Sequence, residues 1–285
     1  MPELPEIETV SRALRPNITG LTVQQVVKRR EKLRMPIPNL EFLVGQTVLG
    51  TDRRSKYLII NFEHGQLLVH LGMSGFLHWA SPTDEVGKHD HWEMRFTDGQ
   101  ILRLRDHRRF GCVLWQPKDT IHDALTHLGP EPLEEAFTTE ILKQQIGKKG
   151  SPIKTVIMDA SVVVGVGNIY ANEALFHSKI DPHSKASDLS DAHLEKLVIA
   201  IKFVLSEGIR LGGATLRDYH SVDGSDGLFA QFTKVYGRAG QECLVCKSTI
   251  QSEMLGQRNT FWCPKCQKKI VKKTSGKGSK QKIKK

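Results

Sequence analysis

Two CxxC pairs near the C-terminal end constrain the fold of this 285-residue chain more than any other feature. The pairs are Cys243/Cys246 and Cys263/Cys266, with sixteen residues between them. Two such turns can hold four thiolates at the corners of a tetrahedron, which is the geometry of a structural zinc site. Disulfides are the alternative, but they are favoured in secreted proteins rather than in the cytoplasm. We therefore expect a zinc ribbon over residues 236–267, with all four cysteines as ligands of one Zn²⁺.

The composition is that of a globular protein without a membrane segment. Hydrophobic residues make up 39% and charged residues 25% of the chain, and its length suits about two domains. No run of apolar residues is long enough to span a bilayer, and the first twenty residues carry acids where a signal peptide would be basic and then apolar. We expect a cytoplasmic monomer, associated with the nucleoid if the source is bacterial.

The positive charge is concentrated at one end. The net charge is +10, but residues 268–285 hold nine lysines and no acid, which leaves 32 basic and 31 acidic residues in the rest of the chain. A nucleic acid would therefore have to meet a local basic face of the body. The tail, which we expect to be disordered, either adds salt-sensitive DNA binding or only aids solubility; both interpretations stay open.

The first 130 residues combine one helix with many short strands. Apolar residues recur at helical spacing over 7–14, and Pro16 and Gly20 are expected to end that helix. Short apolar strands then follow, and the Thr-Asp-Gly turn at 97–99 is a strong hairpin signal. Strands joined by such tight turns favour an antiparallel β-sandwich with the helix at its edge. We expect this N-terminal domain to span residues 1–130.

The second half of the chain changes to helical spacing. Residues 131–150 are expected to be a linker or a crossing helix. Three helix patterns, the longest starting near Ser190, predict a helical domain over residues 151–235, and they are followed by a Gly/Asp/Ser-rich loop. The expected fold class is therefore α+β multidomain: a β-sandwich with an N-terminal helix, a helical domain and a C-terminal zinc ribbon.

The opening MPELPEIETV combines two prolines with three acids. Pro5 suits the first turn of a helix, and Glu3, Glu6 and Glu8 complement the positive end of the helix dipole. These preferences account for the acids, but they give no structural reason for Pro2.

Three segments have the chemistry of phosphate contacts. The turn 165–168 precedes a helix, and its N–H groups are expected to face outward and bind an anion, although Asn168 would also serve as a plain N-cap. Basic clusters stand at 53–56 and at 106–110, the second beside Phe110. Phosphate contact with stacking or wedge insertion would need such a cluster, whereas surface charge beside a buried ring is the plainer alternative.

Two further features have plain structural explanations. Met73, in the loop GMSG, fits a gap-filling core residue. His89 and His91 are spaced like metal ligands, but no third ligand has a recognisable spacing, so a hydrogen-bonded pair is the better interpretation.

Eight motifs follow one another in a recognisable order. They are MPELPEIETV, RRSKYL, HLGMSG, RRFG, HLGPEPL, GVGNIYANE, the loop before QFTKVYGR, and the CLVC and CPKC pairs. Together they resemble the formamidopyrimidine-DNA glycosylase family, which excises oxidised purines, up to about Gln267. The resemblance implies a helix-two-turns-helix domain over 151–235 and double-stranded DNA with oxidised purines or abasic sites as the partner.

The resemblance also implies a bifunctional DNA glycosylase and AP lyase. Such an enzyme removes 8-oxoguanine and formamidopyrimidines and then cuts the abasic site by β,δ-elimination. It implies further that Met1 is removed and that the amine of Pro2 attacks the sugar to form an iminium. An α-amine has a pKa of about 8, so part of it is unprotonated at neutral pH. By the same resemblance Glu3 carries protons to and from the sugar, and Glu6 helps to hold the lesion.

Ten further residues receive roles from the resemblance. Lys56 and Arg258 complete the catalytic set by gripping phosphates. Met73, Arg108 and Phe110 fill the gap left by the extruded nucleotide. The remaining DNA-binding positions are His70, His89, Lys154, Asn168 and Tyr236. A loop at 217–230 corresponds to the one that caps the lesion.

Two rival interpretations stay open. The related endonuclease VIII branch usually has glycine at the position of Leu4, which favours the oxidised-purine branch. A catalytically silent DNA-binding protein would also explain the basic tail and the zinc site. One departure from the family pattern is His107, which stands where proline usually precedes the Arg-Arg pair.

Overall fold

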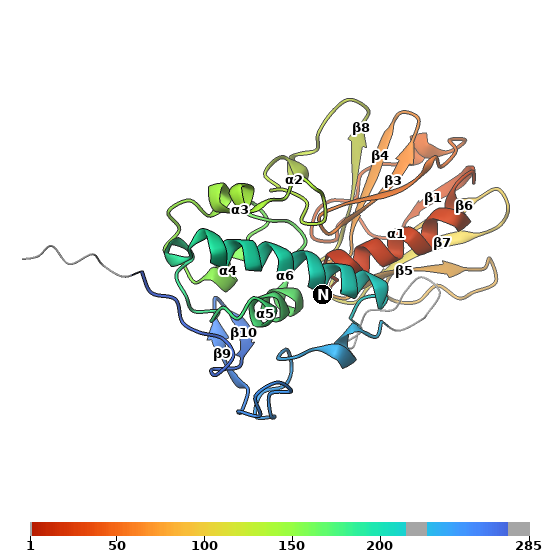
Figure 1. The fold of residues 1–285 in the computed structure, drawn as a ribbon. Coiled ribbons are helices and arrows are strands. Elements are labelled where there is room, and N and C mark those ends of the chain that lie inside the picture. The colour runs from red at the N-terminus through yellow and green to blue at the C-terminus, as the bar shows by residue number, and fades with distance from the viewer. Residues whose placement is uncertain (1, 215–226, 273–285) are drawn as a thin grey trace, which may run out of the picture.

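The computed structural model describes residues 2–214 and 227–272. Met1, most of the 217–230 loop and the end of the lysine tail therefore lie outside the described residues. A β-sandwich and a helical domain meet near the N-terminal end of α1, and a ribbon hairpin lies below the helical domain (Figure 1). Within the described ranges, no helix combines the length and the hydropathy needed to cross a bilayer.

Two antiparallel four-stranded sheets form the N-terminal sandwich. Their strand orders are β1-β6-β7-β5 and β2-β3-β4-β8, so each sheet joins strands that are distant in sequence. The hairpin predicted at 97–99 joins β6 to β7. The elements are α1 Leu4–Ile18, β1 Val23–Lys28, η1 Glu41–Leu43, β2 Gly50–Arg54, β3 Tyr57–Phe62, β4 Gly65–His70, β5 Gly75–Ala80, β6 Asp90–Phe96, β7 Ile101–Asp106 and β8 Cys112–Pro117.

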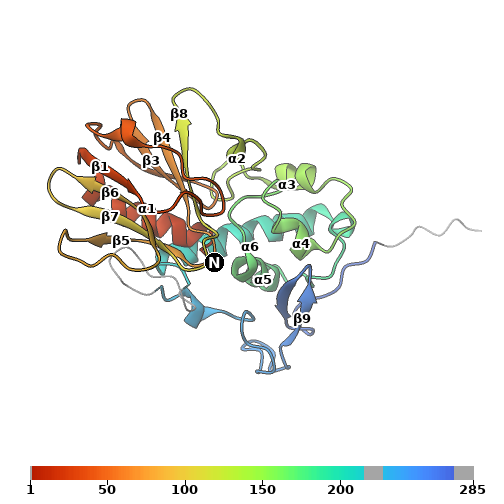
Figure 2. The ribbon, with the colours of Figure 1, turned by 180° about the vertical axis from the view of Figure 1, so that it is seen from behind.

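Helix α1 lies beside the sandwich and runs further than expected (Figure 2). Ile7 and Leu14 are buried in one core with residues of both sheets, which confirms the predicted apolar stripe. Pro16 does not end the helix, because the turn closes after it with a bond from Thr19 N to Arg15 O at 3.2 Å. The chain leaves the helix at Gly20, whose φ of 88° is easily adopted by glycine.

A second core belongs to the helical domain. Helix α2 Asp123–Thr126 still packs against the sandwich, through Ala124 and Leu125. The elements of the helical domain are α3 Thr139–Ile146, α4 Ile153–Ile157, α5 Asn168–His177, η2 Ala186–Asp188, α6 Asp191–Arg210 and η3 Phe229–Phe232. The segment 131–150 contains α3, whose Leu142 and Ile146 pack into this core. Leu4 packs there as well, whereas Ile7 packs into the sandwich. The first turn of α1 therefore joins the two domains.

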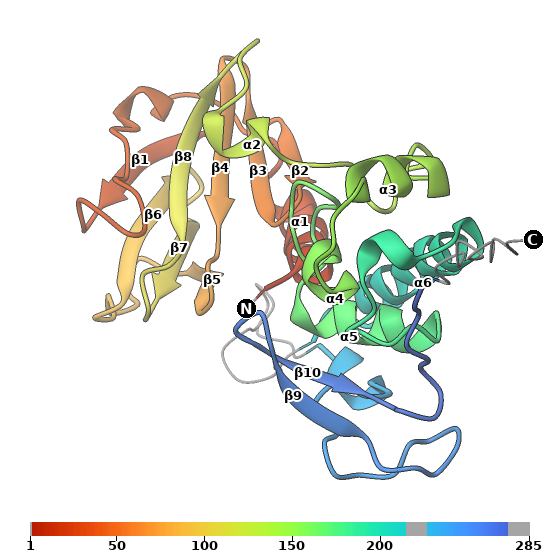
Figure 3. The same ribbon diagram turned by 90° about the vertical axis from the view of Figure 1, so that its left-hand side faces the viewer.

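The ribbon ends in the hairpin β9 Gln251–Leu255 and β10 Arg258–Trp262. Gly256 and Gln257 both have positive φ, 56° and 59°, as in the two-residue turns that match strand twist. The hairpin lies beside α5 (Figure 3), and its turn at Gly256 lies against Thr155 of α4. The chain after the ribbon stays bound to the helical domain, because Ile270 N donates to Ser184 Oγ at 2.9 Å. The tail that we expected to be disordered from residue 268 is thus anchored at its start.

Candidate active site and nucleic-acid interface

The carboxylate of Glu3 is buried where α1 meets the beginning of α5. Only 2% of Glu3 is exposed. Its Oε2 accepts a hydrogen bond from Gly167 N at 2.8 Å, and its Oε1 accepts one from Ile169 N at 3.1 Å. It also caps its own helix, because it accepts from the backbone of Glu6 in a capping box. One acid thus binds the positive ends of two helices.

The glycine turn before α5 makes room for this carboxylate. A side chain on Gly167 would overlap the carboxyl group of Glu3, and one on Gly165 would overlap Leu4. Gly165 also has φ of 78° and accepts a hydrogen bond from Leu4 N at 3.1 Å. We expected the N–H groups of this turn to face outward toward an external anion. In the structure the N–H of Gly167 in this turn and that of Ile169 just after it bind Glu3 instead.

Glu6 is enclosed by hydrogen-bond donors. Its Oε1 accepts from Tyr170 Oη at 2.8 Å and from Ala214 N at 2.7 Å, and its Oε2 accepts from Glu3 N at 2.7 Å. Glu6 therefore fixes the backbone of Glu3 and ties the start of α1 to α5 and to the end of the segment after α6. Helix-dipole complementarity alone does not describe this position.

Lys56 projects from a tight turn between β2 and β3, in which Ser55 has φ of 56°. The neighbouring arginines form ion pairs with Glu131, Arg53 at 2.8 Å and Arg54 at 2.9 Å. Ser55 N donates to the same carboxylate at 2.7 Å. The basic cluster predicted at 53–56 is thus divided: its arginines are paired within the protein, and its lysine faces the acids of α1.

Electrostatics link four of the expected site residues. Burial raises the pKa of Glu3, and the positive charge of Lys56 partly opposes this rise. Burial lowers the pKa of Lys56, and Glu3 opposes that change, whereas Arg258 adds to it. Burial, followed by the charge of Arg258, lowers the pKa of Lys154 to about 8. One buried carboxyl group and three basic side chains therefore influence one another at the start of α1.

The ribbon hairpin is docked by polar groups of the helical domain. Lys154 is 1% exposed, and its Nζ donates to Thr260 Oγ1 at 2.8 Å and to Asn259 O at 3.2 Å. Asn168 Nδ2 donates to the same carbonyl at 3.0 Å. These contacts fix the strand that begins with the exposed Arg258. Lys154 and Asn168, which we expected to contact DNA, thus hold Asn259. This residue directly follows Arg258, a third expected DNA contact.

The three expected gap-filling residues lie on two adjacent loops of the sandwich. Met73 is half-buried between β4 and β5, whereas Arg108 and the 46% exposed Phe110 lie between β7 and β8. The guanidinium of Arg108 stacks 4.8 Å from the centre of the Phe110 ring. The ring of His89 lies 4.4 Å from that of His107, which replaces the usual proline. His89 is thus beside these loops, and partial burial with the nearby His107 lowers its pKa.

His70 and Tyr236 also face the site. Burial, then the charges of Lys56 and Arg34, lowers the pKa of His70 to about 4, so its imidazole is neutral at pH 7. Burial and then Glu3 raise the pKa of Tyr236, whose hydroxyl also bonds Asn168.

Sequence reasoning missed Arg34 and Glu173. Arg34 is exposed, and its N–H donates to Gly111 O at 3.1 Å in the Phe110 loop; the run of basic residues at 28–34 was the available signal. Glu173 is buried and accepts hydrogen bonds from Lys234 N, Val235 N and Tyr236 N at 2.8–3.0 Å. Only its place in the motif GVGNIYANE hinted at a role, namely orientation of Tyr236.

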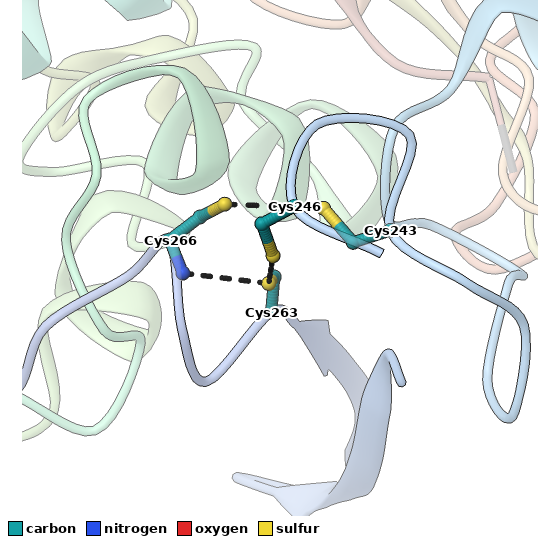
Figure 4. Close-up of side chains that lie close together, drawn as sticks. All are labelled: Cys243, Cys246, Cys263 and Cys266. Carbon is teal, nitrogen blue, oxygen red and sulfur yellow. Dashed lines mark hydrogen bonds between the residues drawn. The ribbon is translucent and has the colours of Figure 1, made fainter. Parts of the chain in front are cut away.

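The four cysteines of the ribbon converge on one point (Figure 4). All four sulfurs lie within 4.8 Å of one another, with Cys243 and Cys266 at 3.9 Å and Cys246 and Cys263 at 3.4 Å. Tetrahedral thiolates on zinc would be about 3.8 Å apart. The set therefore fits one structural Zn²⁺, as predicted. Within residues 2–214 and 227–272 no other group of three or more His, Cys, Asp or Glu has metal-binding geometry, and His89 and His91 are not part of one.

Comparison with known proteins gives the same three parts. The family model for the formamidopyrimidine-DNA glycosylase N-terminal domain matches residues 1–113, and the model for its H2TH domain matches 128–220. The model for the zinc finger found in FPG and IleRS matches 240–269. The chain belongs to the formamidopyrimidine-DNA glycosylase family. The two rival interpretations must therefore be judged within this family.

Individual members of the formamidopyrimidine-DNA glycosylase family match nearly the whole chain. The enzyme of that name from Methylobacillus flagellatus is 49% identical over 272 residues, which cover 94% of this chain and 96% of the relative. The one from Neisseria meningitidis is 48% identical over 275 residues, which cover 94% of this chain and the whole relative.

Solved structures of the family confirm the fold class. The MutM (FPG) protein of Thermus thermophilus superposes with a TM-score of 0.86 at 36% identity, covering 95% of this chain and the whole of that one. Lactococcus lactis Fpg in complex with abasic-site DNA gives 0.87 at 32% identity, covering 94% of this chain and the whole of that one. A mutant of the same protein was solved with DNA that contains Fapy-dG. The α+β arrangement of sandwich, helix-two-turns-helix domain and zinc finger is thus that of the family.

Proposed function

We propose that this chain is a bifunctional glycosylase and AP lyase that removes 8-oxoguanine and formamidopyrimidines from duplex DNA. The observation that carries the proposal is the placement of Pro2 directly before Glu3, whose buried carboxylate is fixed by two helix N-termini and has a raised pKa. A secondary amine and a proton donor beside it are the two groups that the reaction needs.

The chemical steps follow from these two groups. The amine of Pro2 forms a bond to C1′ of the extruded nucleotide and loses its N–H proton. The bond from C1′ to the base breaks, and the base leaves with the bonding electrons and takes up a proton. Glu3 protonates the ring oxygen as the sugar opens, and the new bond becomes an iminium. This iminium accepts electrons when C2′ loses a proton, so the 3′ phosphate and then the 5′ phosphate are eliminated. Water then hydrolyses the remaining iminium and restores the amine of Pro2.

Grip on the DNA is supplied by cationic groups around the same point. Lys56 and Arg258 are proposed to bind phosphates next to the lesion, with Asn168 and Lys154 beside Arg258. Because the imidazole of His70 is neutral, its contribution would be a hydrogen bond and not a charge. Zinc, when bound by the four cysteines, would hold the ribbon in shape and take no part in the chemistry.

Parallel excision assays test this function. Duplexes that differ only in one lesion, 8-oxoguanine, formamidopyrimidine-guanine or thymine glycol, are incubated with the Met1-processed protein. We expect faster excision of both purine lesions and products with phosphates at both ends of the gap. Preference for thymine glycol would instead assign the endonuclease VIII specificity, and inactivity on all three would support a silent DNA-binding protein.

A further inference from the structure

Two loops of the sandwich are built as one unit. The loop between β4 and β5 and the loop between β7 and β8 lie back to back. Gly72, with φ of 64°, has no room for a side chain because a Cβ would overlap the backbone of Phe110 and Gly111. Gly111 is equally confined, since its Cβ would lie 2.7 Å from His70 O. Neither loop can move far without the other.

The buried carboxylate of Asp106 accepts hydrogen bonds from both loops. Asp106 is completely buried at the end of β7. Its Oδ1 accepts a hydrogen bond from Ser74 Oγ at 2.7 Å in the first loop and one from Arg108 N at 3.2 Å in the second. Its Oδ2 accepts one from Gly111 N at 2.8 Å. Asp106 therefore binds the first loop and both ends of the segment that carries Arg108 and Phe110.

Ser74 closes the connection between the loops. Its hydroxyl donates to Asp106 and accepts a hydrogen bond from Arg108 N at 3.0 Å. Ser74 is 3% exposed, and its neighbour in sequence is Met73. The hydroxyl thus couples the backbone beside Met73 to the backbone of Arg108.

We propose that Asp106 and Ser74 are positioning residues that hold Met73, Arg108 and Phe110 ready to enter the space left by an extruded nucleotide. The inference rests on the proposed function, which gives those three side chains their task. If the loop that carries an inserting side chain must first become ordered, the entropy cost weakens DNA binding. A loop that is already fixed avoids this cost. Arg109 is held at φ of 58°, a conformation that a non-glycine residue adopts at a cost and that the surrounding bonds must maintain.

The proposal separates two kinds of substrate. A lesion in a fully paired duplex must be extruded, and the gap must be filled. An abasic site in a single-stranded oligonucleotide needs neither step. Removal of the contacts made by Asp106 and Ser74 should therefore slow the reaction on the duplex and leave the reaction on single-stranded DNA unchanged. Damage to the catalytic centre would slow both reactions.

Two variants and one control test this separation. Asp106→Asn places an amide group against N–H and O–H donors, and Ser74→Ala removes the hydroxyl with little change in volume. Asp98→Asn is the control, because Asp98 accepts a backbone N–H in an exposed turn of the same sheet, away from the loops. For Asp106→Asn we expect kcat/KM on a duplex with 8-oxoguanine opposite cytosine to fall about 10- to 100-fold. Ser74→Ala should lose less, and the control should match the parent protein.

Cleavage of a single-stranded abasic oligonucleotide is the second measurement. Cleavage of this oligonucleotide by both variants should stay within about threefold of the parent protein. The fluorescence of 2-aminopurine next to the lesion should report slower gap filling in the duplex. Equal losses on both substrates, or no loss on the duplex, would overturn the proposal. If Asp106→Asn does not fold, Ser74→Ala decides by the same two criteria. Failure of the parent protein to cleave abasic DNA would instead refute the proposed function.

Discussion

At the scale of single residues, the position of Glu3 is the main finding. The sequence placed an acid at a helix start and a glycine turn before another helix, but 164 positions separate Glu3 from Gly167. Local preferences correctly predict the helix start at Glu3 and the glycine turn before α5. They contain no information that Glu3 binds this turn. The family motifs suggest the proposed role of Glu3, whereas the need for glycine at positions 165 and 167 is visible only in three dimensions.

Gly167→Ala should displace the carboxylate of Glu3, because the added Cβ would overlap it. We expect kcat for 8-oxoguanine excision to fall about 100-fold or more, the usual contribution of a positioned acid. Gly150→Ala is the matched control, since nothing lies within 4 Å of a Cβ there. Single-turnover kinetics measure both, and unchanged chemistry in Gly167→Ala would show that Glu3 does not need this position.

His70 should make the fold sensitive to mild acid. A free imidazole titrates near pH 6.5, whereas the pKa of folded His70 is about 4, so between these values the unfolded chain binds more protons. Stability is therefore present above pH 6.5 and is lost as the pH falls toward 4. The change at pH 5 amounts to about 1–2 kcal/mol.

His70→Asn should remove this loss, because Asn Oδ1 can accept the hydrogen bond that Gly72 N donates to His70 Nδ1. Urea unfolding at pH 7 and pH 5 measures the difference, with the exposed His64→Asn as control. Parallel pH profiles for the parent protein and His70→Asn would contradict the assignment.

At the scale of elements, the sequence predicted strands and helices better than their partners. The Thr-Asp-Gly turn, the long helix after Ser190 and the ribbon were all expected and are present. The pairings of β1 with β6 and of β4 with β8 were not predicted, because they join segments far apart in the chain. Pro16 was expected to help end α1, but it lies inside the last turn. Proline lacks an N–H, yet this turn is still closed by the bond from Thr19 N to Arg15 O.

The ribbon hairpin should depend on its metal. The cysteines share a small core with Phe176 of α5 and Phe261 of β10. We therefore expect zinc binding to stabilise the docking of the hairpin against α5. Cys246→Ala should therefore lower zinc content below one equivalent and weaken binding to duplex DNA with an abasic-site analogue about 10- to 100-fold, the value of a lost charge-assisted contact.

Cys112→Ala is the control for this variant, because Cys112 is buried in the sandwich away from the ribbon. It should keep one zinc and its affinity for DNA. Elemental analysis and fluorescence anisotropy measure the two quantities. Full affinity in a zinc-free Cys246→Ala protein would mean that the hairpin is held without metal.

At the scale of the whole molecule, the segment that we propose to be catalytic is shared between the domains. Leu4 packs with the helical domain and Ile7 with the sandwich, and Glu3 and Glu6 bond to α5 and to the segment after α6. The proposed active site therefore draws on residues from both sides of the expected division at residue 130. Composition could not reveal this sharing, whereas the family motifs are the basis for the proposal that the site lies in MPELPEIETV.

The lysine tail should act through charge alone. Because Lys268 and Ile270 are bound to the helical domain, truncation after Lys272 is a cleaner test than truncation after Gln267. We expect weaker nonspecific DNA binding and a salt slope lower by about 0.9 for each lysine that contacts a phosphate. Titrations at several salt concentrations measure the slope, and an unchanged value would leave the tail with a role in solubility only.

The identity of the nucleophile is the most direct test of the proposed mechanism. The Met1-processed protein is incubated with abasic duplex DNA and borohydride, and the trapped adduct is digested and located by mass spectrometry. We predict one adduct, on the nitrogen of Pro2, and none in a preparation that retains Met1. An adduct on Lys56 or another lysine, or full trapping with Met1 in place, would contradict the mechanism.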